Sequence, residues 1–464
     1  MAVAERVDGR GTSGRFDGPV AAGLPPGPRA PAIVQTIAWT IAPTWLMDRC
    51  ASRLGEMFTF TFAPSGIKFV LVSDPDAVKS VFTASPDIAP SAAGNSPIRP
   101  VMGPSSVLVL TGPEHMRQRK LLLPPFHGER MREYEETIVE ETRRDMASWP
   151  MGRPMRLQAR TRAITLEVIL RAVFGVHDEG MDPLREAIAG LLEPMNMLAI
   201  LRIALTRPTV ERPAGAIGRA LESLDRVLYA EIARRREASD LAERADILSL
   251  LLQARDEEGA AMTDGELRDE LVTLLLAGHE TTATSVAWAI ERLVRHPEKL
   301  ARLKAEIEAG EEEYLGAVVN ETLRVRPVVP IVVRQLQAEL EVGGRLLPAG
   351  TMVAPCIYLT NRNGRVYERP AEFMPERFLG QTPETFSWIP FGGGIRRCIG
   401  ASFAILEMKL MLRTILSELS PRVPNGWRWR RGELIRRRAI TLVPVAGAQV
   451  VWEPSRKKSL NGSP

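Results

Sequence analysis

The 464-residue sequence contains few cysteines and no strong excess of charge of either sign. Its three cysteines, Cys50, Cys356 and Cys398, are far apart and odd in number, which excludes a disulfide framework and fits a reducing compartment. The 60 basic and 56 acidic residues leave a net charge of +4, which is too balanced to predict nucleic acid as a partner. With 45% hydrophobic and 25% charged residues, the composition is that of an ordinary globular protein.

Segments that would target or anchor the chain are also missing from the sequence. Glu5 and Arg6 fall where a signal peptide needs its apolar core. Residues 32–47 are apolar, but Gln35 and Pro43 interrupt them, and the stretch is too short to span a bilayer. We therefore expect a cytoplasmic protein without an integral membrane anchor.

No linker and no internal repeat divides the chain, although its length alone suggests two or three domains. The pattern is mostly helical from about 113 to 310, with short strands before and after. This predicts a mainly α protein with small β-sheets (α+β). We expect a disordered segment at 1–30, one domain at 31–452 and a flexible tail at 453–464.

Two local patterns predict defined elements. Residues 57–72 alternate phenylalanine with threonine, turn at 64–66 and return, which is typical of a β-hairpin. Thr263 and Glu266 have the spacing of a capping box. They predict the start of a long helix that continues to His296 and spans roughly 45–50 Å, enough to cross a domain.

The most informative feature that is present is one cysteine between glycines, at the start of an amphipathic helix. Cys398 follows Arg396 and Arg397, with Gly394 before them and Gly400 after. Metals bind a thiolate, and a helix N-terminus with nearby positive charge lowers a cysteine pKa. Glycines also let the backbone pass close to a flat macrocycle. The pattern predicts a thiolate ligand for haem iron rather than zinc, because no second cysteine or histidine lies at ligand spacing.

This segment resembles the haem loop of the cytochrome P-450 superfamily, Phe-x-x-Gly-x-(Arg/His)-x-Cys-x-Gly. Each position of that pattern is filled, by Phe391, Gly394, Arg396, Cys398 and Gly400. Further segments in the expected order extend the resemblance over most of the chain. The resemblance implies a monooxygenase that carries haem b between the long central helix and the helix after the cysteine, with Cys398 as the axial ligand of the iron.

The long helix carries a second motif in its interior. A glycine there costs about 1 kcal/mol against alanine, and such exceptions mark function or close packing. The family pattern (Ala/Gly)-Gly-x-(Asp/Glu)-Thr-(Thr/Ser) matches at every position. It implies O2 beside Ala277 and Gly278, Thr281 hydrogen-bonded to the bound oxygen, and Glu280 supplying protons through water. A salt-bridged helix acid is the alternative role for Glu280, and we interpret His279 as structural.

Glu321 and Arg324 lie three residues apart and therefore share a helix face. In general such a pair lies on the surface and contributes well under about 1 kcal/mol. The family buries this Glu-x-x-Arg pair and joins it to an arginine of a later loop, which implies Arg377 as the third member. A buried triad fixes geometry and is costly to break, so we assign it to support of the fold.

Haem propionates are carboxylates that need fixed cations or donors, and arginine suits them. One arginine alone is weak support, because most arginines are solvated. The resemblance implies four propionate-binding residues, namely His115, Arg119, Arg334 and Arg396.

The expected substrate is a hydrophobic small molecule such as a fatty acid, a terpenoid or a steroid-like compound. The loops 90–106 and 194–208 are expected to line its pocket, although the second fits a buried helix stripe equally well. Other pocket residues implied by position are Val329, Ile331, Val332, Ile440 and Thr441.

The sequence contains no flavin or iron–sulfur motif, so electrons are expected from a ferredoxin or flavodoxin with its NAD(P)H-dependent reductase. Arginines around the cysteine loop predict a basic patch for an acidic partner, unless they are simply solvated: Arg365, Arg369, Arg377, Arg396 and Arg397. A peroxide-driven peroxygenase is a rival hypothesis, which the Glu280 and Thr281 pair argues against. A non-catalytic haem sensor is another, disfavoured by the apolar pocket segments and the lack of a signalling domain.

Overall fold

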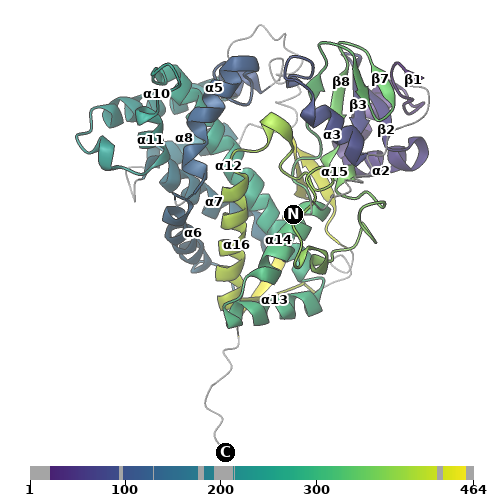
Figure 1. The fold of residues 1–464 in the computed structure, drawn as a ribbon. Coiled ribbons are helices and arrows are strands. Elements are labelled where there is room, and N and C mark those ends of the chain that lie inside the picture. The colour runs from purple at the N-terminus through teal and green to yellow at the C-terminus, as the bar shows by residue number, and fades with distance from the viewer. Residues whose placement is uncertain are drawn as a thin grey trace, which may run out of the picture.

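The computed structural model describes residues 21–92, 98–128, 130–175, 182–192, 213, 215–425 and 432–455. Figure 1 shows most helices gathered around two crossing ones, α12 and α16, with the strands β1, β2, β3, β7 and β8 collected at one side. The α-helices are α1 (Ala32–Ile41), α2 (Pro43–Leu54), α3 (Pro75–Thr83), α4 (Arg99–Met102), α5 (Gly112–Leu122), α6 (Arg130–Met146), α7 (Leu157–Phe174), α8 (Asp182–Leu192), α10 (Gly215–Arg236), α11 (Ile247–Gln253), α12 (Asp264–Leu293), α13 (Pro297–Ala309), α14 (Glu313–Val325), α15 (Ile357–Thr360) and α16 (Ala401–Glu418). Short 3-10 helices are η2 (Pro124–Phe126), η4 (Leu241–Glu243), η5 (Pro375–Phe378) and η6 (Gly394–Arg396).

The strands form four small sheets within the described residues. The largest has the order β2 (Met57–Phe62), β3 (Ile67–Val72), β8 (Met352–Pro355) and β5 (Arg334–Gln335), and the others are β1 (Ala21–Ala22), β7 (Arg345–Leu347) and β6 (Leu340–Val342); β4 (Pro154–Arg156), β12 (Gln449–Pro454) and β9 (Leu419–Arg422); and β10 (Ile435–Arg438) with β11 (Thr441–Pro444). Strands β2 and β3 pair antiparallel over their whole length, which confirms the predicted hairpin. The mainly α architecture with small sheets is therefore confirmed.

Helix α12 is the central element of the fold. Thr263 and Glu266 form the predicted capping box, with hydrogen bonds in both directions. The helix has 30 residues, about 45 Å, and ends at Leu293, three residues before the predicted end. It packs against α7 and α16, and side chains from all three helices belong to the main hydrophobic core. The prolonged helix thus places its motif in the middle of the molecule.

The first described residues belong to the sheet region. Strand β1 pairs in parallel with β7, and the Thr59 hydroxyl donates to the carbonyl of Pro25 at 2.6 Å. The described part of the chain thus begins at Ala21, in contact with the sheet region. Residues 1–20 and 456–464 lie outside the described residues. Within the described part of the chain, every helix is too short or too polar to cross a membrane.

Candidate active site

The loop that carries Cys398 joins η6 to α16. The amide of Cys398 donates to the carbonyl of Phe391 at 3.0 Å, and the amide of Arg397 donates to that of Gly394 at 3.1 Å. These two bonds close the loop on itself, and α16 begins directly after it, at Ala401. The side chain of Cys398 is left exposed, whereas Cys50 and Cys356 are buried. Of the three cysteines, Cys398 alone presents its sulfur to open space.

The Cys398 thiol is accessible but lies in a space that protein atoms surround, and this desolvation raises its pKa. The amide of Gly400 and the charges of Arg397 and Arg119 lower it, as the sequence predicted, but burial outweighs them. Our prediction that charge and the helix N-terminus would lower this pKa is therefore wrong in its net direction. A metal ion deprotonates a coordinating thiol outright. Metal binding would therefore convert Cys398 to the thiolate, which the local charges alone do not achieve.

The glycines of this loop are required by a contact with α3. A Cβ atom on Gly393 would lie 2.3 Å from the ring of Phe82, and one on Gly394 would lie 2.3 Å from the carbonyl oxygen of Phe82. Gly394 also has φ +65°, which favours glycine. We expected these glycines to face a macrocycle, but Gly393 and Gly394 pack against protein. At Gly400 a Cβ atom would meet nothing within 4 Å.

Four predicted propionate-binding residues come together from three elements: His115 and Arg119 on α5, Arg334 on β5 and Arg396 in η6. Burial, followed by the charges of Arg396, Arg119 and Arg334, lowers the pKa of His115 to about 4. Burial, followed by the charges of Arg334 and Arg119, also lowers the pKa of Arg396 to about 10. Among the described residues none of the four makes an ion pair, so their charge is uncompensated by protein carboxylates.

A small pocket opens beside these cations. Its lining includes Phe82, His115, Arg334 and Arg396. The Nδ1 atom of His115 is buried there without a hydrogen-bond partner. Arg396 donates instead to main chain, to the carbonyl of Val107 at 3.0 Å and to that of Leu110. Uncompensated cations and an unpartnered ring nitrogen are what a bound dianion would satisfy.

The motif in the middle of α12 includes an exposed residue, although most of the surrounding helix is buried. Ala277 is exposed, while Gly278 lies against α7, where an added Cβ would be 3.3 Å from Ile169 Cδ1. The Thr281 hydroxyl donates to the carbonyl of Ala277 at 2.8 Å, and the Thr282 hydroxyl to that of Gly278 at 3.3 Å. Both hydroxyls therefore bond back to the preceding turn of the helix. Space is therefore present beside Ala277 but not beside Gly278.

The acid of the motif is held by two arginines. Glu280 lies 2.7 Å from Arg162 Nε of α7 and 3.4 Å from Arg438 Nη1 of β10. This is the salt-bridged arrangement that we named as the alternative to a proton-supplying role. His279 is buried, its Nδ1 lies 2.8 Å from the carbonyl of Leu275, and burial lowers its pKa to about 4. These contacts agree with a structural role for His279.

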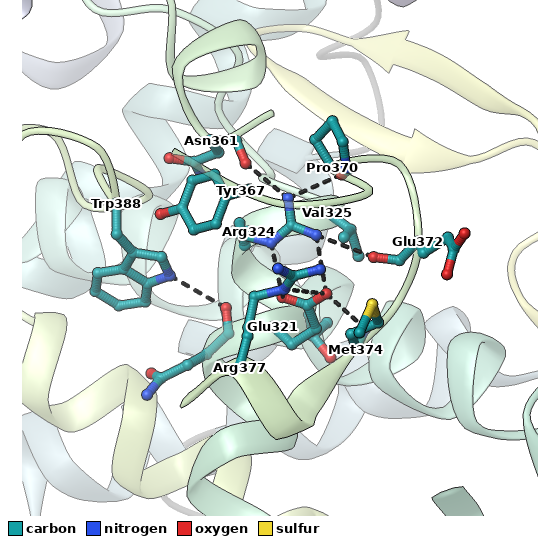
Figure 2. A network of polar contacts seen from close by, with 12 residues as sticks. Glu321, Arg324, Val325, Asn361, Tyr367, Pro370, Glu372, Met374, Arg377 and Trp388 are labelled. Atoms are coloured by element: carbon teal, nitrogen blue, oxygen red, sulfur yellow. Dashed lines mark hydrogen bonds and ion pairs between the residues drawn. The ribbon is translucent and has the colours of Figure 1, made fainter. Parts of the chain in front are cut away.

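Figure 2 shows the buried network around Glu321 and Arg324 on α14. Arg324 donates to Glu321 at 2.7 and 2.9 Å, and also to the carbonyls of Asn361, Pro370 and Glu372. Arg377 Nε lies 3.3 Å from Glu321 Oε2. The three predicted residues are therefore in contact. Arg324 thus holds the backbone at Asn361 and at residues 370–372, both of which precede the cysteine loop.

Comparison with known proteins agrees with this geometry. The family model described as Cytochrome P-450 matches residues 25–429. Cytochrome P-450 137 of Mycobacterium tuberculosis is 40% identical over 457 residues, covering 95% of this chain and 94% of its own length. Cytochrome P-450 135B1 of Mycobacterium bovis is 40% identical over 447 residues, covering 94% and 93%. The chain belongs to the cytochrome P-450 family.

Solved structures agree on the fold. The retinoic acid-bound cyanobacterial CYP120A1 has a TM-score of 0.79 at 22% identity and covers 93% of this chain and 100% of its own. The cytochrome P450DA haem domain has a TM-score of 0.80 at 22% identity, covering 94% and 99%. The cofactor of this cytochrome P-450 is haem b, and its reaction class is monooxygenation with O2, a hydrophobic substrate and a redox partner.

The residues present fit a haem. One exposed thiol follows η6, and four donors without carboxylate partners lie on α5, β5 and η6. His115 Nδ1 is orphaned beside a pocket. A porphyrin carries one metal and two carboxylates, which suit one thiolate ligand and a set of cationic donors. No cluster of three or more histidine, cysteine, aspartate or glutamate side chains that could hold a metal ion occurs among the described residues.

Two residues that bear on the site were missed by sequence reasoning. Asn361 Oδ1 accepts the amide of Ile389 at 3.0 Å just before the cysteine loop. Glu407 is fully buried on α16, bonded by Thr282 of the α12 motif, and burial raises its pKa to about 8. The available indication was a lone acid within the apolar stripe that includes Phe403 and Leu410.

The predicted pocket residues do not share one environment. Val329 and Val332 are half-buried and pack against the cluster that contains Phe82. Ile331 packs against a different cluster, which contains Trp39. At the β10–β11 turn Ile440 is 49% exposed and Thr441 is buried. The whole loop 194–208 lies outside the described residues, and so do residues 93–97 of the loop 90–106.

The five arginines of the predicted basic patch are not equivalent. Arg365 pairs with Glu56 and Asp74, and Arg369 with Glu368 and Glu372. Arg377 belongs to the Glu321 network, and Arg396 turns inward to main chain. Only Arg397 of the five is exposed without an ion pair among the described residues. The cationic face is therefore narrower than the sequence predicted.

Proposed function

We propose that the protein uses Cys398 as the thiolate ligand of haem iron and inserts one atom of O2 into a hydrophobic small molecule. The exposed sulfur in a loop surrounded by unpaired cations is the observation that carries this proposal. Bound haem supplies the activation of O2. Cys398 would hold the iron, while His115, Arg119, Arg334 and Arg396 would orient the propionates.

We further propose that the α12 motif handles protons. The Thr281 hydroxyl lies on the open side of the helix and can exchange its bond to Ala277 for one to a neighbouring oxygen atom or water. Glu280 would supply protons through water, although its carboxylate is engaged by Arg162 and Arg438. Release of a proton along this route then requires those ion pairs to exchange with water.

The proposed substrates are fatty acids, terpenoids and steroid-like compounds. Support comes from the apolar character of the predicted pocket residues, among them Val329, Val332 and Ile440, which would select by shape rather than by charge. A shift of the Soret band on titration with each compound class would rank them. We propose a cytoplasmic location, and a ferredoxin or flavodoxin with its NAD(P)H-dependent reductase as the electron source.

The test of thiolate ligation is the absorption spectrum of the reduced protein under carbon monoxide, for wild type and Cys398→Ser. We expect a strongly red-shifted Soret band in the wild type and its loss in the variant. Cys50→Ser, at a buried thiol, is the matched control and should keep the band. A band at the histidine-ligated position in wild type would overturn the proposal.

A peroxide-driven peroxygenase stays a second hypothesis, because the ion pairs of Glu280 leave its proton supply in question. Product formation with hydrogen peroxide alone, compared with O2 and the reductase system, separates the two reactions. Faster turnover with peroxide would favour the peroxygenase. An absence of product with both would favour a non-catalytic haem sensor.

A further inference from the structure

Helix α1 carries four of its apolar side chains on the outside. Ile33, Val34, Ile37 and Ile41 are 55%, 48%, 51% and 69% exposed. Gln35 and Trp39, in contrast, are only 6% and 5% exposed and face the core. An ordinary surface helix places polar residues opposite its buried face, whereas α1 places three isoleucines and a valine there. In the first turn of α2, just along the chain, Trp45 is 56% exposed. We call these five apolar residues the α1 face.

Polar contacts fix this orientation. Gln35 Nε2 donates to the carbonyl of Ala30 at 2.8 Å, and its Oε1 accepts the amide of Thr61 of β2 at 3.0 Å. The hydroxyl of Thr36 accepts the amide of Ala63 at 2.9 Å. Rolling the helix to bury its isoleucines would break these bonds and leave buried polar groups unpaired, which is costly. The α1 face is therefore held outward by the fold.

The surroundings of the α1 face are cationic. Arg49 lies over the ring of Trp45 at 5.5 Å, and Arg29 and Arg53 are exposed on the same segment. None of these three arginines makes an ion pair within the described part of the chain. The acid nearest in sequence, Asp48, accepts the hydroxyl of Tyr358 at 2.9 Å. Figure 1 shows α2 at the edge of the molecule, beside β2 and β3 and away from α16.

We propose that the α1 face is a docking surface for an anionic lipid bilayer. An interfacial helix buries an apolar face at the headgroup boundary while cations meet anionic headgroups, and tryptophan favours that boundary. Free cations beside isoleucines, with one engaged acid, complement such a surface better than they complement a second copy of the same cationic face. The helix lies on the membrane, since no described helix is able to span one. This inference goes beyond the proposed reaction and does not depend on it.

The test is co-sedimentation of the haem-loaded full chain with vesicles of equal parts phosphatidylcholine and phosphatidylglycerol. The wild type should bind, and Ile37→Ser/Ile41→Ser should bind at least about tenfold more weakly. Arg49→Gln/Arg53→Gln should also bind these vesicles more weakly than wild type, and this difference should be larger at low salt than at high salt. The matched control is Met151→Ser/Val366→Ser, which changes two exposed apolar residues elsewhere and should leave binding unchanged.

Sedimentation velocity without lipid, and thermal unfolding of each variant, accompany the vesicle assay. Equal melting temperatures show that lost binding is not lost folding, which is expected because the altered side chains are exposed. No vesicle binding by the wild type would overturn the proposal. So would a lipid-free dimer that the isoleucine variant dissociates, or wild-type binding that the isoleucine variant retains in full.

Discussion

Glu407 is a residue whose ionisation the fold opposes. It is buried on α16, its Oε1 has no partner, and Thr282 is its described hydrogen-bond donor. Burial raises its pKa from 4.5 to about 8. Between those values the folded protein holds a proton that the unfolded chain releases. The free energy of unfolding therefore falls as pH rises through this window, by up to about 1.4 kcal/mol per pH unit.

Glu407→Gln should remove this contribution while keeping the shape of the side chain. We expect the variant to gain stability over wild type progressively from about pH 5 to about pH 8. Urea unfolding of the haem-loaded proteins across that range measures it. Glu258→Gln, at an exposed acid, is the control and should run parallel to wild type. Parallel curves for Glu407→Gln as well would show that Glu407 is not the titrating group.

Thr281→Ala should uncouple electron consumption from product formation. The variant lacks the hydroxyl that bonds Ala277 at 2.8 Å on the open side of α12. We expect the product formed per NAD(P)H to fall severalfold or more, as for a lost proton-transfer group. Hydrogen peroxide should form in its place, while NAD(P)H is consumed at a similar rate. Ser285→Ala removes a hydroxyl one turn away, bonded to the Thr281 carbonyl, and should stay coupled. A fully coupled Thr281→Ala would exclude Thr281 from the proton route.

Residue identities were predictable where chemistry depends on short spacing. The residues from Phe391 to Gly400, and the pair Glu321 and Arg324, follow from motifs within ten positions. Their electrostatics were not predictable, because the net pKa shift of Cys398 depends on burial by distant segments. The ion pairs of Glu280 likewise involve Arg162 and Arg438, which are remote in sequence.

At the scale of elements, the cysteine loop is shaped by its contact with α3. Gly393→Ala would bring a methyl group within 2.3 Å of the Phe82 ring, and Gly394→Ala would meet the Phe82 carbonyl at the same distance. A ring can be replaced, whereas a main-chain carbonyl cannot. Both alanine variants should lose about 1–3 kcal/mol of stability by overpacking and should retain less haem.

Adding Phe82→Ala to each glycine variant distinguishes a clash with the Phe82 ring from a clash with the Phe82 carbonyl. It should restore haem retention to Gly393→Ala, because the clash is with the side chain. Gly394→Ala should stay impaired, since its clash is with main chain and its φ of +65° disfavours alanine. Haem absorbance per protein and thermal unfolding of the four variants measure both effects. Equal rescue of both glycine variants would contradict the contact that we describe.

Elements defined by adjacent residues were predicted well, and those defined by distant partners were not. The β2–β3 hairpin and the capping box of α12 depend on short local patterns, and both are present. The parallel pairing of β3 with β8 joins segments far apart, so no local pattern indicated it. The apolar residues 32–47 were noted only as too short to span a bilayer. That α1 turns Ile33, Ile37 and Ile41 outward follows from tertiary bonds of Gln35.

At the scale of the whole molecule, the approach of an acidic electron donor depends on which arginines keep free charge. Arg365 is offset by Glu56 and Asp74, whereas Arg397 is exposed and unpaired within the described residues. Steering acts through net local charge and weakens as salt screens it. Arg397, next to Cys398, is therefore the residue through which the cysteine face should attract its partner.

Arg397→Gln should slow reduction by an acidic ferredoxin severalfold at low salt, and the difference should shrink at high salt. Arg365→Gln should have the smaller effect, because its charge is already balanced by two carboxylates. Stopped-flow reduction under carbon monoxide gives the rates, and an unchanged Soret band in each variant shows that the haem site is intact. Equal effects of both substitutions, or rates indifferent to salt, would mean that the partner docks without electrostatic guidance from this face.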